Sequence, residues 1–144
     1  MTSLAEFLDR MTAEGELFET LPNRELRCLA CAQRCLIRPG KRGICQVRYN
    51  ESGSLRVPWG YVAALQVDPI EKKPFFHILP GSEALTFGML GCDFHCAYCQ
   101  NCFTSQAMRD PASDAAAGLV HQISPEQMVS LARRSGAALI ASSY

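Results

Sequence analysis

Three cysteines in one short loop constrain this chain more than any other feature of its sequence. Cys92, Cys96 and Cys99 lie in the segment GCDFHCAYC, which follows an apolar run from Leu85 to Leu90. Such a run is typical of a buried parallel strand, and loops after parallel strands often carry the sites of α/β folds. Iron-sulfur cubanes are normally held by four cysteine thiolates. Three thiols at this spacing therefore predict a 4Fe-4S cluster with one iron left open.

The number of cysteines raises the question of redox compartment. Eight cysteines could form disulfides in a secreted protein. The segment from Met1 to Met11 argues against secretion, because it contains Glu6 and Asp9 and lacks the basic start and continuous apolar stretch of a signal peptide. We therefore expect a cytoplasmic protein whose clustered cysteines stay reduced and bind metal.

Charge and hydropathy argue against two classes of partner. Fourteen Lys and Arg residues balance fourteen Asp and Glu residues, and no stretch gathers basic side chains densely enough to follow a phosphate backbone. No apolar run approaches the roughly 18 residues that a membrane span requires. We expect neither nucleic acid nor a membrane as a partner.

The first two parts of the chain are predicted to be small. Residues 1–20 contain a helix, which Ser3 can cap with Glu6 in a capping box. Residues 21–83 consist of short apolar segments broken by Pro and Gly, a pattern that predicts a cysteine-rich module of strands and loops. We expect the aromatic residues of this module to be core. They are Trp59, Tyr61, Phe75 and Phe76.

Residues 84–144 are predicted to be an α/β segment. Ser124 is typical of an N-cap, with Pro125 at the first helical position and Gln127 completing a capping box. The run from Ala137 to Ala141 predicts a second buried strand. The resulting order of strand, loop, helix and strand is one crossover of a parallel sheet.

A second group of four cysteines lies in the module. Their spacing is C-x2-C-x3-C-x9-C, and the members are Cys28, Cys31, Cys35 and Cys45. Four thiols so spaced suit a structural zinc site that would staple a loop-rich module. An auxiliary iron-sulfur cluster or a reduced set without metal fits the same spacing, because spacing alone does not separate soft metals. All three alternatives stay open.

The loop with three cysteines resembles the signature of the radical S-adenosylmethionine (SAM) superfamily, C-x3-C-x2-C with an aromatic residue just before the third cysteine. The resemblance implies that Cys92, Cys96 and Cys99 ligate the cluster and that Tyr98 contacts the adenine of SAM. An open iron can chelate the amine and carboxylate of SAM, so that one electron cleaves SAM to a 5′-deoxyadenosyl radical. The difficult chemistry then belongs to the cofactors.

The resemblance narrows when further segments are included. The stretch DPIEKKP from Asp68 to Pro74, together with His77, Pro80-Gly81 and Gln100-Asn101, is similar to the radical SAM protein of the AmmeMemoRadiSam system. That family is related to the pyruvate formate-lyase activating enzymes. It implies glycyl-radical-activase-like chemistry, a flavodoxin or ferredoxin as electron donor, and a protein as a candidate substrate.

This family also implies a partial (βα)6 barrel, whose first strand delivers the cluster loop and whose second ends in a Gly-Gly-Glu-like segment that grips SAM. Ser142-Ser143-Tyr144 stops at that segment, without its acidic residue. An eight-fold barrel takes about 250 residues. We therefore expect an N-terminal fragment of a longer enzyme, inactive by itself.

Simpler interpretations compete with the enzyme. Cys102 adds a fourth thiol that could close the cluster and make a non-enzymatic electron-transfer or interaction module. The resemblance favours an unligated Cys102. His95 lies inside the loop, but such a residue more often packs or hydrogen-bonds locally, so it is not counted as a ligand.

Overall fold

The computed structural model describes residues 3–110 and 113–143, with side chains of residues 113–115 left out. The chain forms two compact units. One draws on residues 1–59 and 90–118 and contains all eight cysteines, so we call it the cysteine unit. The other draws on residues 60–89 and 119–144, and we call it the sheet unit. The predicted division between residues 83 and 84 differs from this one, because residues 60–83 belong to the sheet unit and the loop after residue 89 groups with the N-terminal cysteines.

The cysteine unit is built from two small antiparallel sheets. The first has the order β1-β6-β5 (Thr12–Glu14, Ser54–Pro58 and Tyr49–Glu51). The second has the order β2-β3-β4 (Phe18–Thr20, Leu26–Cys28 and Leu36–Ile37). Their shared core consists of Leu26, Cys28, Ile37 and Leu55, each at most 5% exposed. One member of the second cysteine group is thus a core residue.

Helix α1 spans Leu4–Asp9 and confirms the predicted capping box. The backbone N–H of Ser3 donates to Glu6 Oε2, and the Ser3 hydroxyl accepts from the Glu6 N–H. The N-terminal segment of residues 1–20 is helical only as far as Asp9. There the Thr12 hydroxyl donates to the Asp9 carbonyl, and the following residues pair as β1 and β2. Pairing with β6 and β3 outweighs continuation of so short a helix.

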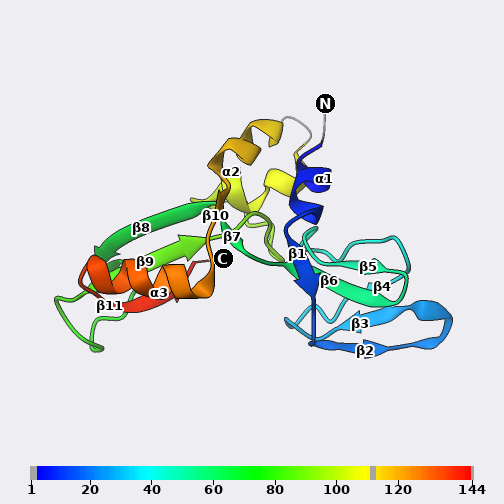
Figure 1. Ribbon diagram of the computed structural model, residues 1–144, viewed down its shortest axis with the longest axis horizontal. Helices are drawn as coiled ribbons and strands as arrows, with labels where there is room; N and C mark the ends of the chain where they lie inside the picture. The colour runs from blue at the N-terminus through cyan, green and yellow to red at the C-terminus, as the bar shows by residue number, and fades with distance from the viewer. Residues whose placement is uncertain (1–2, 111–112, 144) are drawn as a thin grey trace. The chain divides into compact units, whose positions relative to one another are not determined.

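The sheet unit contains a three-stranded sheet of order β11-β9-β8 (Figure 1). Its strands are Ala137–Ser142, Glu83–Gly88 and Ala64–Pro69. β9 and β11 are parallel, whereas β8 is antiparallel to β9. Helix α3, Pro125–Arg134, precedes β11 and lies along this sheet in Figure 1. The predicted order of strand, loop, helix and parallel strand is confirmed.

The remaining elements are short. β7 (Tyr61–Val62) pairs with β10 (His121–Gln122), and α2 spans Cys102–Ser105. The described residues also contain the 3-10 turns η1 (Pro22–Arg24), η2 (Ile70–Lys72), η3 (Ala107–Arg109) and η4 (Ser113–Leu119). In the described part of the chain, no helix is long and apolar enough to cross a membrane. Over the same residues the parallel strands form an open sheet, and the barrel implied by the resemblance stays an expectation.

The start of α3 follows its local signals. The Ser124 hydroxyl accepts from the Gln127 N–H at 3.2 Å, and the Ser124 N–H donates to Gln127 Oε1 at 2.8 Å. This capping box satisfies N–H groups that the first helical turn cannot pair internally. The predicted helix start is therefore confirmed.

Two predictions of burial were wrong. β11 alternates between half-buried and exposed positions, because successive side chains of a strand point to opposite faces and α3 packs against this strand. Of the aromatic residues expected in the core, Tyr61 is buried. The other three, Trp59, Phe75 and Phe76, are 44–61% exposed. They lie at a strand end and in a turn, where no apolar face covers them.

Candidate functional site

The predicted cluster ligands lie on the segment between β9 and α2. We call residues 91–101 the cluster loop. It starts at Gly91, which is buried at φ +88° and donates its N–H to the Thr104 carbonyl at 3.2 Å. The loop closes in successive turns, in which the Cys99 N–H donates to the Cys96 carbonyl and the Cys102 N–H to the Cys99 carbonyl. The three predicted thiols are therefore carried by one loop after a strand of the parallel pair.

The thiols of the cluster loop differ in their surroundings. Cys92 Sγ accepts a hydrogen bond from the Phe94 N–H at 3.4 Å, and Cys99 Sγ lies 3.3 Å from the Ser105 hydroxyl. Cys96 is exposed, whereas Cys92 and Cys99 are half-buried. Cys92 Sγ also donates to Asp93 Oδ1 at 3.9 Å. Hydrogen bonds to sulfur tune the potential of iron-sulfur clusters. Two of the three candidate ligands thus have hydrogen-bonding partners at sulfur.

All eight cysteines are free thiols. Within residues 3–110 and 113–143, no group of three or more His, Cys, Asp or Glu side chains is arranged to hold a metal ion. The donor set of the cluster loop nevertheless fits a cluster chemically, because it offers soft thiols without a competing disulfide. Metal binding commonly brings together ligands that are apart in the metal-free chain.

Aromatic side chains are exposed around the cluster loop. Tyr98 is 90% exposed, Phe94 is 61% exposed, and Phe103 in α2 is 56% exposed. Large apolar side chains gathered on a surface commonly mark a place where a ligand or another polypeptide binds. The residue predicted to contact adenine is thus accessible to a ligand.

Two further candidate ligands, Cys102 and His95, are both exposed. Cys102 is the first residue of α2. Neither position decides whether the side chain would ligate a metal, so the preference for an unligated Cys102 stays a prediction.

The other four cysteines lie within residues 28–45, which we call the four-cysteine module. Cys28 is buried and donates its N–H to the Cys35 carbonyl at 2.9 Å. Cys35 Sγ accepts from the Ile44 N–H at 3.4 Å. Burial raises the pKa of the Cys31 thiol, and the Asp93 carboxylate raises it further. A bound cation would have to oppose these effects to hold Cys31 as a thiolate.

The sequence did not indicate that the two cysteine groups touch, but the structure joins them. Arg109 donates to the carbonyl of Ile44 in the module and to that of Cys92 in the cluster loop. Gln33 Nε2 also donates to the Asp93 carbonyl at 3.4 Å. No local pattern marks Arg109, since its partner Ile44 lies 65 residues away in the sequence.

The DPIEKKP stretch, Asp68 to Pro74, forms a turn in the sheet unit. Asp68 is only 9% exposed and binds Lys72 Nζ at 2.6 Å and Lys73 Nζ at 3.1 Å. Glu71 Oε1 accepts from the Gly81 N–H at 2.8 Å. His77 is exposed. The charged run is therefore an ion-paired turn in which Asp68 holds both lysines.

We predict that this turn stabilises the protein in a pH-dependent way. The hydrogen bond from Lys72, followed by that from Lys73, lowers the pKa of Asp68. A lowered folded-state pKa gives stability that is present above the unfolded pKa, about 4, and is lost as the pH falls through the folded value. Asp68→Asn should lower the melting temperature at pH 7, and its difference from wild type should shrink toward pH 3. A difference that grows on acidification would contradict this assignment.

The carboxyl ends of β9 and β11 lie side by side. Ser142 is the register partner of Phe87, and the Ser143 N–H donates to the Phe87 carbonyl at 2.9 Å. These serines occupy the segment that the resemblance equates with the SAM clamp. Tyr144, the last residue of that segment, lies outside the described residues.

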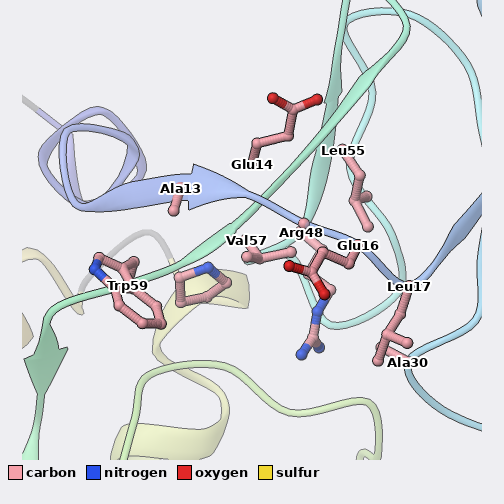
Figure 2. Close-up of a pocket in the computed structure, with 11 residues that line it drawn as sticks. Ala13, Glu14, Glu16, Leu17, Ala30, Arg48, Leu55, Val57 and Trp59 are labelled. Carbon is pink, nitrogen blue, oxygen red and sulfur yellow. The ribbon is translucent and has the colours of Figure 1, made fainter. Parts of the chain in front are cut away.

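A cavity of about 530 Å³ lies in the cysteine unit, beside β1 and β6 (Figure 2). Trp59 and Leu17 stand at opposite ends of its lining, with Val57 and Arg48 between them. Arg48 Nε is buried and has no hydrogen-bond partner among the described residues. No cysteine lines this cavity, so it is not where the cluster ligands meet.

The fold and the site together define a cysteine-rich α/β chain with two groups of thiols, one of them on a loop after a parallel strand. It is similar to the uncharacterized protein MJ0808 of Methanocaldococcus jannaschii, with 37% identity over 122 residues. The alignment covers 84% of this chain and 35% of that protein, so the chain spans about a third of the length of this relative. No family model and no solved structure matches the chain.

Proposed function

We propose that this chain is the cluster-binding part of a radical SAM enzyme, with chemistry like that of glycyl-radical activases. The observation that carries the proposal is the cluster loop: the free thiols of Cys92, Cys96 and Cys99 follow a strand of a parallel pair on one short segment. The hydrogen bonds to Cys92 Sγ and near Cys99 Sγ support ligation of a 4Fe-4S cluster.

A reduced cluster held by these thiols would supply the one electron that cleaves SAM into methionine and a 5′-deoxyadenosyl radical, and would itself be oxidised by one electron. The chain's own residues have simpler roles. Cys92, Cys96 and Cys99 hold the metal, and exposed Tyr98 offers a ring face to the adenine. The exposure of Tyr98 supports this role, because an accessible ring can stack on a ligand without displacing core contacts.

The proposal also covers the location, the electron donor and the substrate of the whole protein. We infer a cytoplasmic location, because eight free thiols suit a reducing compartment. A flavodoxin or ferredoxin would supply the electron, and a protein would be the substrate. The chain covers only 35% of its relative, so the parts that choose the substrate are expected outside the matched region.

The proposal is tested by reconstituting the full-length protein anaerobically with iron and sulfide, then adding SAM and dithionite. We expect 5′-deoxyadenosine to be released in amounts that depend on the cluster. A reconstituted protein that carries the cluster but forms no 5′-deoxyadenosine would refute SAM cleavage. MJ0808, which is longer, provides a parallel sample for the same assay.

A second candidate function is an electron carrier that uses Cys102 as the fourth ligand. The observation in its favour is the turn that joins the Cys102 N–H to the Cys99 carbonyl at 3.3 Å, which places the two residues close together. Cys102→Ser separates the candidates. Loss of the cluster supports the carrier, and a retained cluster that still responds to SAM supports the enzyme.

We predict that Tyr98→Ala weakens SAM binding by roughly 3- to 10-fold, because an aromatic contact is worth about 0.5–1.5 kcal/mol. Tyr98→Phe keeps the ring and should bind SAM like the wild type. Equilibrium binding of SAM to the cluster-loaded protein measures both variants. Equal affinity in Tyr98→Ala and wild type would remove Tyr98 from the adenine site.

A further inference from the structure

One guanidinium joins the two cysteine groups within the cysteine unit. Arg109 Nη2 donates to the carbonyl oxygens of Ile44 at 2.5 Å and Cys92 at 2.8 Å. Its Nη1 donates to Gln106 Oε1 at 2.7 Å and approaches the Phe94 carbonyl at 3.5 Å. A planar fork of donors is suited to holding several acceptors in fixed directions. Arg109 therefore ties the cluster loop to the four-cysteine module.

The contacts of Arg109 continue to a sulfur on each side. Ile44 accepts from Arg109 through its carbonyl and donates its N–H to Cys35 Sγ. Cys92 accepts from Arg109 through its carbonyl, while its Sγ accepts from the Phe94 N–H. Hydrogen bonds thus connect Cys35 Sγ to the backbone of Cys92 through Ile44 and Arg109.

The backbones of the two segments also pack closely. A Cβ added to Gly91 would lie 2.8 Å from the Cys45 carbonyl oxygen and 2.7 Å from Val47 Cγ1. Such distances are shorter than real Cβ contacts, so only glycine allows this approach. The residue that precedes the first cluster cysteine therefore rests directly on the last cysteine of the module.

We propose that the four-cysteine module is the platform that holds the cluster loop, with Arg109 as the positioning residue between them. An intact module then raises the retention of metal by Cys92, Cys96 and Cys99. Groups that orient metal ligands typically change metal affinity by 10- to 100-fold. The inference rests on the proposed function only in taking these three cysteines as cluster ligands.

The test measures how fast the anaerobically reconstituted protein loses iron to a ferrous chelator, together with its visible circular dichroism. Arg109→Ala should lose iron roughly 10-fold faster than wild type and show an altered visible spectrum. Arg133→Ala is the matched control, because Arg133 is an exposed arginine at the end of α3. An Arg109→Ala protein that keeps iron as well as this control overturns the proposal.

A double-mutant cycle separates coupling from general damage. Cys35→Ser should also speed iron loss from the cluster loop, although Cys35 is not one of its ligands. In the Arg109→Ala background, Cys35→Ser should add less than about twofold, since the connection is already broken. Two effects that simply multiply would show that module and loop act independently.

The glycine contact gives a second, separate comparison. Gly91→Ala should speed iron loss, because the added methyl pushes the loop from the Cys45 carbonyl. Gly40→Ala controls for backbone strain, as Gly40 has a similar φ of +71° but nothing within 4 Å of an added Cβ. Equal iron retention in these two variants would count against the platform.

These experiments still test the platform if a variant folds poorly or if SAM is not cleaved. Should Arg109→Ala unfold, Gln33→Ala decides, since it removes a single exposed bond to Asp93: faster iron loss supports the platform, and an unchanged rate overturns it. If iron retention depends on Arg109 but no 5′-deoxyadenosine forms, the proposed enzymatic function is refuted and the platform is not. If SAM is cleaved but Arg109→Ala retains iron as well as wild type, the platform is refuted and the proposed enzymatic function is not.

Discussion

Replacing Cys96 with serine should abolish cluster binding, with iron and sulfide after reconstitution falling at least about tenfold below wild type. Cys96 is the most accessible of the three thiols and has neither of the sulfur hydrogen bonds found at Cys92 and Cys99. Its removal should therefore disturb the folded chain little while depriving the cluster of one of three ligands. Iron and sulfide analysis, with visible absorption, measures the effect.

Cys102→Ser is the matched control for this prediction, because Cys102 is also an exposed thiol near the end of the same loop. It should retain iron and sulfide like wild type. Full cluster content in Cys96→Ser would contradict the ligand assignment. A loss confined to Cys102→Ser would point to a different set of ligands in this loop.

Asn50→Ala should destabilise the cysteine unit by about 2–4 kcal/mol. Asn50 is fully buried, and its Nδ2 donates to the carbonyls of Arg24 at 2.7 Å and Ile37 at 2.8 Å. Its Oδ1 accepts from the Gly53 N–H at 2.7 Å. Alanine would leave the Ile37 carbonyl unsatisfied in a buried place, which costs about 1–3 kcal/mol, and would remove two part-buried bonds worth about 0.5 kcal/mol or more each.

Denaturant unfolding followed by circular dichroism measures this loss of stability. Gln122→Ala serves as the control, because Gln122 is an exposed amide on β10. The control should change the free energy of unfolding by less than about 0.5 kcal/mol. A similarly small effect of Asn50→Ala would mean that the carbonyls of Arg24 and Ile37 find other donors.

The sequence predicted those parts of the fold that local interactions decide. Ser3 and Ser124 begin helices because each makes a capping box with a residue three positions later. The same local logic predicted β9 and β11 from their apolar runs. It failed for Trp59 and Phe75, because burial depends on which distant surface covers a side chain rather than on its hydrophobicity.

The candidate site was predictable to a similar extent. Spacing alone identified the two cysteine groups, because the cysteines of each group lie close together in the sequence. Their contact was not predictable, because Arg109 and Ile44 meet only through the fold. The burial of Asp68 with two lysines bound to it was likewise not predictable, because it depends on how the turn packs in the fold.

The central claim is that three cysteines hold a cluster with an open iron that binds SAM. Electron paramagnetic resonance of the reconstituted, reduced protein tests it most directly, with about four irons per cluster loop confirmed beforehand. We predict a reduced-cluster signal that changes when SAM is added and persists in Cys102→Ser. A signal that SAM leaves unchanged and that disappears in Cys102→Ser would contradict it.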